Sequence, residues 1–150
     1  MDISNLEYKS KTATEAEIYT HLKECDDNFI PPLSEKVDVQ EYSKKLYGKS
    51  VTFEAWSKNI LAGLVAAYFN DPKNQTGYIT NVSLIKDYSG RGIASRLIED
   101  CIQYAKQNKF REIRLEVNKD NGPAIHLYKK YGFIEYEKND NSLFMMFKVS

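Results

Sequence analysis

The chain has 150 residues, of which 42% are hydrophobic and 13% aromatic, and its 21 basic residues balance 21 acidic ones. This length predicts a single domain over residues 1–150, and the composition excludes a disordered chain. The balanced charge argues against nucleic acid or an anionic membrane as a partner, because both require a basic excess.

Signals for membrane insertion, secretion and metal binding are also missing from the sequence. The longest apolar run, Ile60–Phe69, has ten residues and is half of a membrane span. The first ten residues, MDISNLEYKS, have neither the basic nor the apolar region of a secretory signal. Cys25 and Cys101 are too few for a disulfide framework or a zinc site, so we interpret both as buried free thiols. These features predict a cytoplasmic protein without a metal.

The first third of the chain predicts a strand and two helices. A short strand covers Leu6–Lys9, and helical spacing of apolar residues runs over Thr14–Cys25. Two prolines in DDNFIPPLS then enforce an extended turn. A second helix covers Val39–Tyr47, and we expect Gly48 to end it as a C-cap.

Three strands and a long helix are predicted in the middle of the chain. The strands are Val51–Trp56, Leu61–Phe69 and Tyr78–Ile85, and the last two are separated by the turn cluster NDPKNQTG. The helix covers Gly92–Gln107 and has its apolar residues on one face.

The remaining chain predicts a strand, a helix and a closing hairpin. Apolar and polar residues alternate over Glu112–Asn118, and a helix with Pro123 in its first turn runs to Tyr131. The hairpin strands are Phe133–Lys138 and Leu143–Val149. Strands that cluster before a single strand–helix–strand unit predict an α+β class with a mixed sheet.

The loop DYSGRGIASRL, Asp87–Leu97, leads from a predicted strand into a helix. The first N–H groups of a helix have no internal partner and carry a partial positive charge, so they suit a phosphate. Gly90 and Gly92 permit unusual dihedral angles, while Arg91 and Arg96 add positive charge. We therefore expect a pyrophosphate-bearing ligand, with a plain turn as the alternative. A Rossmann site fits poorly because Ser95 stands where a third glycine is needed, and a P-loop is excluded because no G-K-S/T is present.

Together with a second stretch, LEVNKDNGPAIHLYKKYGF, this loop resembles the GNAT family of acetyl-CoA-dependent N-acetyltransferases. The loop is similar to the family motif R/Q-x-x-G-x-G/A, and the second stretch has N-x-x-A-x-x-L-Y-x-x-x-G-F in full from Asn121 to Phe133. The resemblance implies a GNAT fold, with a mostly antiparallel sheet of six to seven strands between helices on both faces, and acetyl-CoA as cosubstrate. It places the cofactor on Val82, Leu84, Ser89, Gly90, Arg91, Gly92, Ile93, Ala94, Ser95, Asn121 and Ala124. Ser89 departs from the usual arginine or glutamine and offers no charged fork.

The resemblance also implies two catalytic residues. It places Tyr128 beside the thioester sulfur, although transfer of a tyrosine proton to a thiolate is uphill by about 2 kcal/mol at reference pKa values. Tyr128 is therefore expected to donate a hydrogen bond as much as a proton, and a plain core tyrosine is the alternative. Glu116 lies in the register of a glutamate that acts as base through water in ribosomal-protein N-terminal acetyltransferases. A structural ion pair of Glu116 with Arg114 or a lysine is the alternative.

The sequence says least about the molecule that accepts the acetyl group. The resemblance assigns its pocket to CDDNFIPPLSEK, where Asp26 and Asp27 could attract an ammonium ion and Phe29 could pack an apolar portion; an exposed acidic turn is the alternative. We expect a small primary amine or an amino sugar as acceptor. A protein N-terminus, a lysine, a longer acyl donor and a non-catalytic acyl-CoA-binding module stay open, as does a homodimer formed through the apolar closing hairpin.

Overall fold

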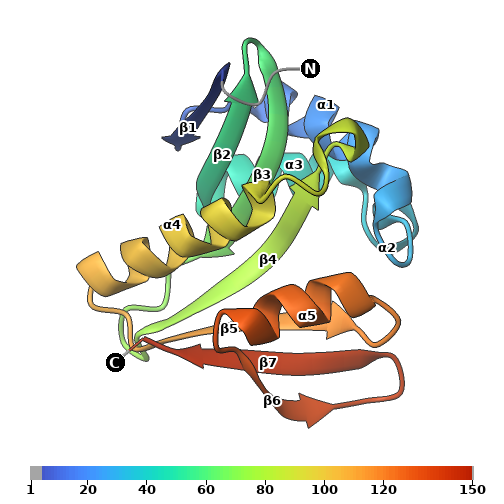
Figure 1. Ribbon diagram of the computed structural model, residues 1–150. Helices are drawn as coiled ribbons and strands as arrows, with labels where there is room; N and C mark the ends of the chain where they lie inside the picture. Colours follow the sequence, from blue (N-terminus) through green and yellow to red (C-terminus); the bar gives the residue numbers. More distant parts are fainter. Residues whose placement is uncertain (1–4, 150) are drawn as a thin grey trace.

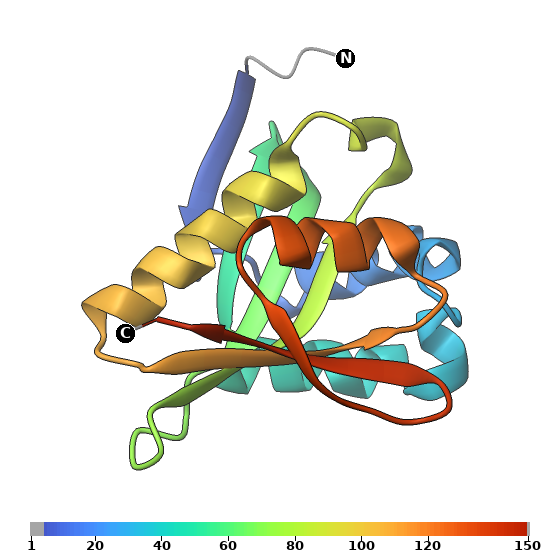
Figure 2. The same cartoon turned by 60° about the horizontal axis from the view of Figure 1, so that its bottom comes forward.

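The computed structural model describes residues 5–149, and these form one seven-stranded sheet covered by helices on both faces (Figures 1 and 2). The strand order is β1-β2-β3-β4-β5-β7-β6, and every neighbouring pair is antiparallel except β4–β5. The strands are β1 (Leu6–Ser10), β2 (Val51–Ser57), β3 (Ile60–Tyr68), β4 (Thr76–Leu84), β5 (Glu112–Asn118), β6 (Ile134–Lys138) and β7 (Ser142–Lys148). The α-helices are α1 (Glu15–Cys25), α2 (Leu33–Lys36), α3 (Val39–Lys49), α4 (Ile93–Gln107) and α5 (Gly122–Lys130). The predicted fold class is confirmed.

Two apolar clusters lie on opposite faces of the sheet. Side chains of α1 and α3 pack on the face of β2 and β3 that carries Trp56, Leu61 and Leu64. The apolar face of α4 packs on the other side, against Phe53, Val65 and their neighbours. Figure 2 shows α4 and α5 together on that second side, with α1 and α3 behind the sheet. Both cysteines are buried free thiols, as predicted.

One local expectation was wrong, and one short helix was not predicted. Gly48 does not end α3; the helix continues to Lys49, and Ser50 closes it by donating its backbone N–H and its hydroxyl to the Leu46 carbonyl. The proline turn contains one further helical turn, α2, which begins after Pro32 and is too short to show a periodic pattern. Asp26 fixes this turn, because its two carboxylate oxygens accept from the backbone N–H and the hydroxyl of Ser34, each at 2.7 Å.

A buried carboxylate joins the start of the chain to the sheet. Glu54 on β2 has no exposed surface, and its oxygens accept from the hydroxyl of Thr52, the indole N–H of Trp56, the backbone N–H of Ala13 and both donors of Thr12. Burial alone would raise the pKa of Glu54, but these hydrogen bonds outweigh it and lower the pKa. Glu54 therefore stays ionised and holds the β1–α1 connection.

Candidate functional site

The site is built where two parallel strands separate. β4 and β5 are paired only between Thr76–Ile79 and Glu112–Leu115, although β4 continues to Leu84. A bulge in β4 opposite Ala66 and Ala67 accompanies the separation. Beyond the last pair, β4 and β5 have no ladder between them, and a gap opens in the middle of the sheet (Figure 1).

Backbone groups of β4 face this gap. The N–H of Ile85 donates to Ala62 on β3 at 2.9 Å, and antiparallel pairing alternates along a strand. The backbone groups of Ser83 consequently point to β3, whereas those of Val82 and Leu84 point away from β3, toward the gap. There the carbonyl of Leu84 accepts from the side chain of Asn28 at 3.4 Å. An extended ligand in the gap could pair with the backbone groups of Val82 and Leu84 as an added strand would.

The glycine loop leads to the N-terminus of α4. Gly90 and Gly92 have φ values of 76° and 77°, in the left-handed region that favours glycine. Gly92 is the N-cap residue of α4, no side chain caps this end, and the first turn has no acidic residue. The backbone N–H groups of Ile93, Ala94 and Ser95 therefore remain available for an anion.

The side chains around this loop differ in what they can contribute. Arg91 is exposed beside the two glycines. Arg96 turns away to Asp100, at 3.2 Å, and stacks on the ring of Tyr8. The hydroxyl of Ser89 donates to the carbonyl of Lys86, so its proton is used within the preceding turn. Arg91 is thus the loop side chain that adds positive charge.

Tyr128 lies in a small cavity at the gap. The cavity has a volume of about 130 Å³ and is lined by Thr80, Asn81 and Val82 of β4, by Glu116 and Val117 of β5, and by Asn121 and Tyr128 beyond β5, among others. Asn121 is the N-cap of α5, since its side chain accepts from the backbone N–H of Ala124 at 3.3 Å. Burial raises the pKa of Tyr128, and its hydroxyl has no hydrogen-bond partner among residues 5–149. The hydroxyl therefore keeps its proton and is free to donate it to a ligand.

Glu116 lines both this cavity and a larger neighbouring one. The larger cavity, of about 730 Å³, is also lined by Ile30, Tyr42, Tyr78 and Ser142. Within residues 5–149, Glu116 forms no ion pair, and Arg114 instead pairs with Glu112 at 3.0 Å. Its carboxylate accepts from the hydroxyl of Ser142 at 2.7 Å, which leaves further lone pairs free for a water or an amine.

The predicted acceptor residues are not all brought together. Phe29 lines the small cavity with Tyr128 and Glu116. Asp26 and Asp27 line neither of the two cavities, and Asp26 is engaged with Ser34. The hydrogen bonds from Ser34 lower the pKa of Asp26.

A buried chain of hydrogen bonds connects α1 to the small cavity, and no sequence pattern indicates it. His21, 2% exposed, donates from Nδ1 to the carbonyl of Leu61 at 2.7 Å, and its Nε2 lies 2.8 Å from the hydroxyl of Ser83. That hydroxyl lies 2.7 Å from the side-chain oxygen of Asn81, which lines the cavity. Because 62 positions separate His21 from Ser83, no local pattern could reveal the contact.

We expect the stability of the protein to depend on pH through His21. Burial lowers the pKa of His21 to about 4, although its bond to Leu61 opposes the shift. Between this value and 6.5 the unfolded chain binds more protons than the folded one, so the free energy of unfolding falls as the pH falls through this range. From pH 6.5 to 5 the loss is about 2 kcal/mol.

Urea unfolding at pH 7 and pH 5 tests this expectation. His21→Gln should remove most of the difference between the two pH values, whereas His126→Gln, at an exposed position of α5, should keep it. Equal pH dependence in wild type and His21→Gln would contradict it.

Comparison with known proteins places this chain among acetyltransferases. The model of the Acetyltransferase (GNAT) family matches residues 15–133. N-alpha-acetyltransferase MAK3 of Arabidopsis thaliana is 32% identical over 108 residues, which cover 71% of this chain and 57% of that protein. The chain spans about half the length, or less, of the first curated relatives it matches.

Solved structures share the fold at low sequence identity. The ribosomal-protein-S18-alanine N-acetyltransferase of Escherichia coli has a TM-score of 0.77 and 18% identity, covering 97% of this chain and 94% of its own. The PaiA N-acetyltransferase of Thermoplasma acidophilum, solved with coenzyme A, has a TM-score of 0.75 and 14% identity, covering 95% and 99%. Within residues 5–149, no helix is long and apolar enough to cross a membrane, and no group of three metal-ligating side chains is present.

Proposed function

Because the chain belongs to the GNAT acetyltransferase family, we propose that it transfers the acetyl group of acetyl-CoA to a primary amine by direct attack on the thioester. The observation that carries this proposal is the cavity at the β4–β5 gap, where the free hydroxyl of Tyr128 and the carboxylate of Glu116 line one space. The hydroxyl of Tyr128 can donate to the departing thiolate, and the carboxylate of Glu116 can accept the ammonium proton.

The cofactor is proposed to bind across the gap and the glycine loop. Its pyrophosphate would lie on the N–H groups of Gly90 to Ser95, with Arg91 adding charge, and its pantetheine arm would pair with Val82 and Leu84. Ala124 and Asn121 would border the arm at the start of α5. The coenzyme A bound in the Thermoplasma neighbour supports acetyl-CoA as the donor.

In the proposed reaction the amine nitrogen attacks the thioester carbon, the N–C bond forms and the C–S bond breaks. The proton that the nitrogen loses as the amide forms passes to the departing sulfur, so coenzyme A leaves as its thiol. Glu116 takes the ammonium proton, directly or through water, before the attack. A backbone N–H at the β4 bulge stabilises the oxyanion. Tyr128 donates a hydrogen bond to the sulfur as charge develops there; its raised pKa makes full proton transfer costlier than at reference values.

The acceptor is proposed to be a small primary amine or an amino sugar, which would enter through the larger cavity. The N-terminus of a peptide is the second candidate, because the relatives include N-alpha-acetyltransferases and the larger cavity, of about 730 Å³, has room for more than one residue. Phe29 is kept as an acceptor contact, while Asp26 and Asp27 are proposed only as charges near the entrance. A cytoplasmic location and a homodimer stay predictions from the sequence.

A thiol-release assay tests the function and separates the two acceptors. Acetyl-CoA is incubated with a panel of small amines, amino sugars and short peptides, and free coenzyme A is measured. Release with small amines alone supports the first candidate, and release with peptides alone supports the second. Binding of acetyl-CoA without release from any acceptor would favour the non-catalytic module.

We expect acetyl-CoA to raise the melting temperature, and Gly92→Val to abolish this effect. A ligand at one hundred times its Kd adds about 2.7 kcal/mol to the free energy of unfolding. Valine is strained at the φ of 77° and would place its branched side chain beside the anion-binding N–H groups. Gly48→Val, at an open position of α3, is the control and should keep the full shift. A normal shift in Gly92→Val would contradict the loop as the phosphate site.

We expect Glu116→Gln to lower turnover mostly at low pH. The acceptor ammonium ion is then hardest to deprotonate, and an amide cannot take its proton. The pH profile of kcat/KM is the measurement. Glu112→Gln is the control, because it removes the charge that pairs with Arg114 and replaces the acceptor of the Thr76 hydroxyl, but lines neither cavity. Profiles that stay parallel to wild type at every pH would mean that Glu116 is not the base.

A further inference from the structure

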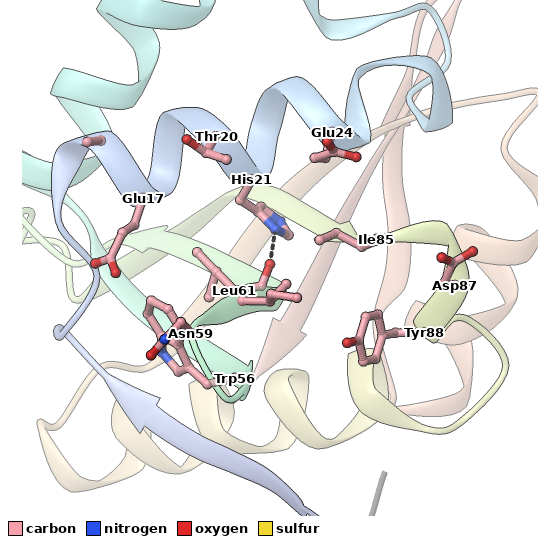
Figure 3. A pocket seen from close by; sticks show the side chains of 12 residues that line it. Glu17, Thr20, His21, Glu24, Trp56, Asn59, Leu61, Ile85, Asp87 and Tyr88 are labelled. Carbon is pink, nitrogen blue, oxygen red and sulfur yellow. Dashed lines mark hydrogen bonds between the residues drawn. The ribbon is translucent and has the colours of Figure 1, made fainter. Parts of the chain in front are cut away.

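We propose that a second cavity, between α1 and the β2–β3 turn, binds an organic ammonium ion with an apolar body. The cavity has a volume of about 530 Å³ and is formed by three segments: one face of α1, the turn that ends β2, and the connection from β4 to α4. Figure 3 shows its side chains. The lining residues include Glu17, His21, Glu24, Trp56, Leu61, Ile85, Asp87 and Tyr88.

The charges on this cavity all have one sign. Glu17, Glu24 and Asp87 line it, and no lysine or arginine does. One oxygen of Glu17 caps α1, but Glu24 and Asp87 take part in no ion pair within residues 5–149. Figure 3 shows the three carboxylates spread around the cavity and not clustered at one point. Such a field favours a cation over a neutral molecule of the same shape.

The hydroxyl of a largely buried tyrosine points into the same space. Tyr88 is 8% exposed, and its hydroxyl has no hydrogen bond with any residue in the described part of the chain. In Figure 3 this hydroxyl is directed across the cavity toward Trp56. An ammonium N–H bound there would donate to the hydroxyl oxygen, which has no partner within residues 5–149.

The rest of the cavity lining is mostly apolar and aromatic. Leu61 and Ile85 form the floor of the cavity (Figure 3). Ile60 also lines it and is 51% exposed. The indole N–H of Trp56 is already used by Glu54, so Trp56 offers its ring and not its donor. Two aromatic rings and an apolar floor suit a hydrocarbon or aromatic body, and the rings also attract a cation.

This cavity is separate from the proposed site of acetyl transfer. The two cavities at the β4–β5 gap share no lining residue with it. His21 lines this cavity and connects to the small one only through its hydrogen bonds by way of Ser83 and Asn81. An amine bound here therefore lies outside the acetyl-transfer cavity, and the proposal holds whether or not the chain acetylates amines.

Fluorescence of Trp56 tests the proposal directly, because it is the only tryptophan in the 150 residues. The whole chain, without acetyl-CoA, is titrated with 2-phenylethylammonium chloride and, separately, with neutral 2-phenylethanol. We expect a saturable change with the ammonium ion and at least a threefold weaker Kd for the alcohol. Glu24→Gln should weaken ammonium binding about threefold, as expected for a partly solvated pair. Tyr88→Phe should weaken it about fivefold.

Two control variants make the result specific. Glu15→Gln lies on α1 but does not line the cavity, and Glu116→Gln lies in the acetyl-transfer cavity; both should leave the Kd unchanged. The proposal would be overturned if the alcohol bound as tightly as the ammonium ion, if the fluorescence showed no saturable change, or if Glu15→Gln weakened binding as much as Glu24→Gln. A loss of binding in Glu116→Gln would place the amine in the acetyl-transfer cavity and would overturn it as well.

Discussion

Tyr128→Phe should lower kcat roughly a hundredfold, within the range of a positioned acid, and leave the Kd of acetyl-CoA nearly unchanged. The substitution removes one oxygen from a buried ring that packs against Phe133, so the fold is kept. The hydroxyl matters only when charge develops on the sulfur, and its loss therefore costs transition-state binding and not ground-state binding.

Turnover for this comparison is measured by thiol release under conditions where chemistry limits the rate, and Kd by calorimetry. Tyr131→Phe is the matched control, because Tyr131 lies at the end of the same helix and donates only to Glu99, at 3.0 Å. Its kcat should stay within about twofold of wild type, as surface substitutions generally have small effects. Wild-type turnover in Tyr128→Phe would remove Tyr128 from the mechanism.

Glu54→Ala should lower the free energy of unfolding by about 3–5 kcal/mol, the largest effect on stability that we expect, because each buried donor left unpaired costs about 1–3 kcal/mol. The carboxylate is fully buried, and its removal leaves the donors of Thr12, Ala13 and Trp56 without a partner. It also opens a space in β2 beneath the β1–α1 connection. Urea unfolding at pH 7 measures the change.

Two further variants define what Glu54 contributes. Glu54→Gln keeps the side-chain volume but replaces the carboxylate by an amide. Its free energy of unfolding should lie between those of Glu54→Ala and wild type. Glu7→Ala, on the exposed edge strand β1, should change the free energy of unfolding by less than about 0.5 kcal/mol.

The stabilisation by Glu54 should also depend on pH. Since the folded pKa of Glu54 is lowered, its contribution to the free energy of unfolding is present above the unfolded pKa and is lost as the pH falls through the folded pKa. A loss below 1 kcal/mol in Glu54→Ala at pH 7 would contradict the interpretation.

The elements could be predicted from the sequence wherever a local signal dominates. The stripe of apolar residues on α4 and the alternation along β5 each follow from side-chain spacing, and both elements lie within a residue of their predicted bounds. Gly48 misled the prediction because a glycine near a helix end favours a C-cap, yet Ser50 supplies the stronger hydrogen bonds two residues later. The single turn of α2 depends on Asp26, eight residues before its partner Ser34.

The local geometry of the candidate site could be predicted only in part, because some of its features depend on neighbouring residues and others do not. The glycine conformations in the loop and the capping of α5 by Asn121 follow from neighbouring residues. The larger cavity does not, because Tyr42 contributes from α3 and its hydroxyl reaches Thr80 on β4, 38 positions away. The sequence predicts Asp26 as a charge free to attract an ammonium ion, whereas its hydrogen bond with Ser34 is visible only in the folded chain.

The short ladder between β4 and β5 also governs how the molecule opens. Four backbone pairs join the four-stranded block β1–β4 to the three-stranded block β5–β7–β6, and farther along the strands the facing edges carry amides without a strand partner. Local unfolding follows such weakly joined boundaries, so amide hydrogen exchange should be fastest along these edges and the two blocks should exchange as separate cooperative units. An extended ligand that pairs with Val82 and Leu84 would extend the ladder and merge the two units into one. The backbone groups that recognise the ligand would then be the same groups that decide whether the sheet unfolds in one step or in two.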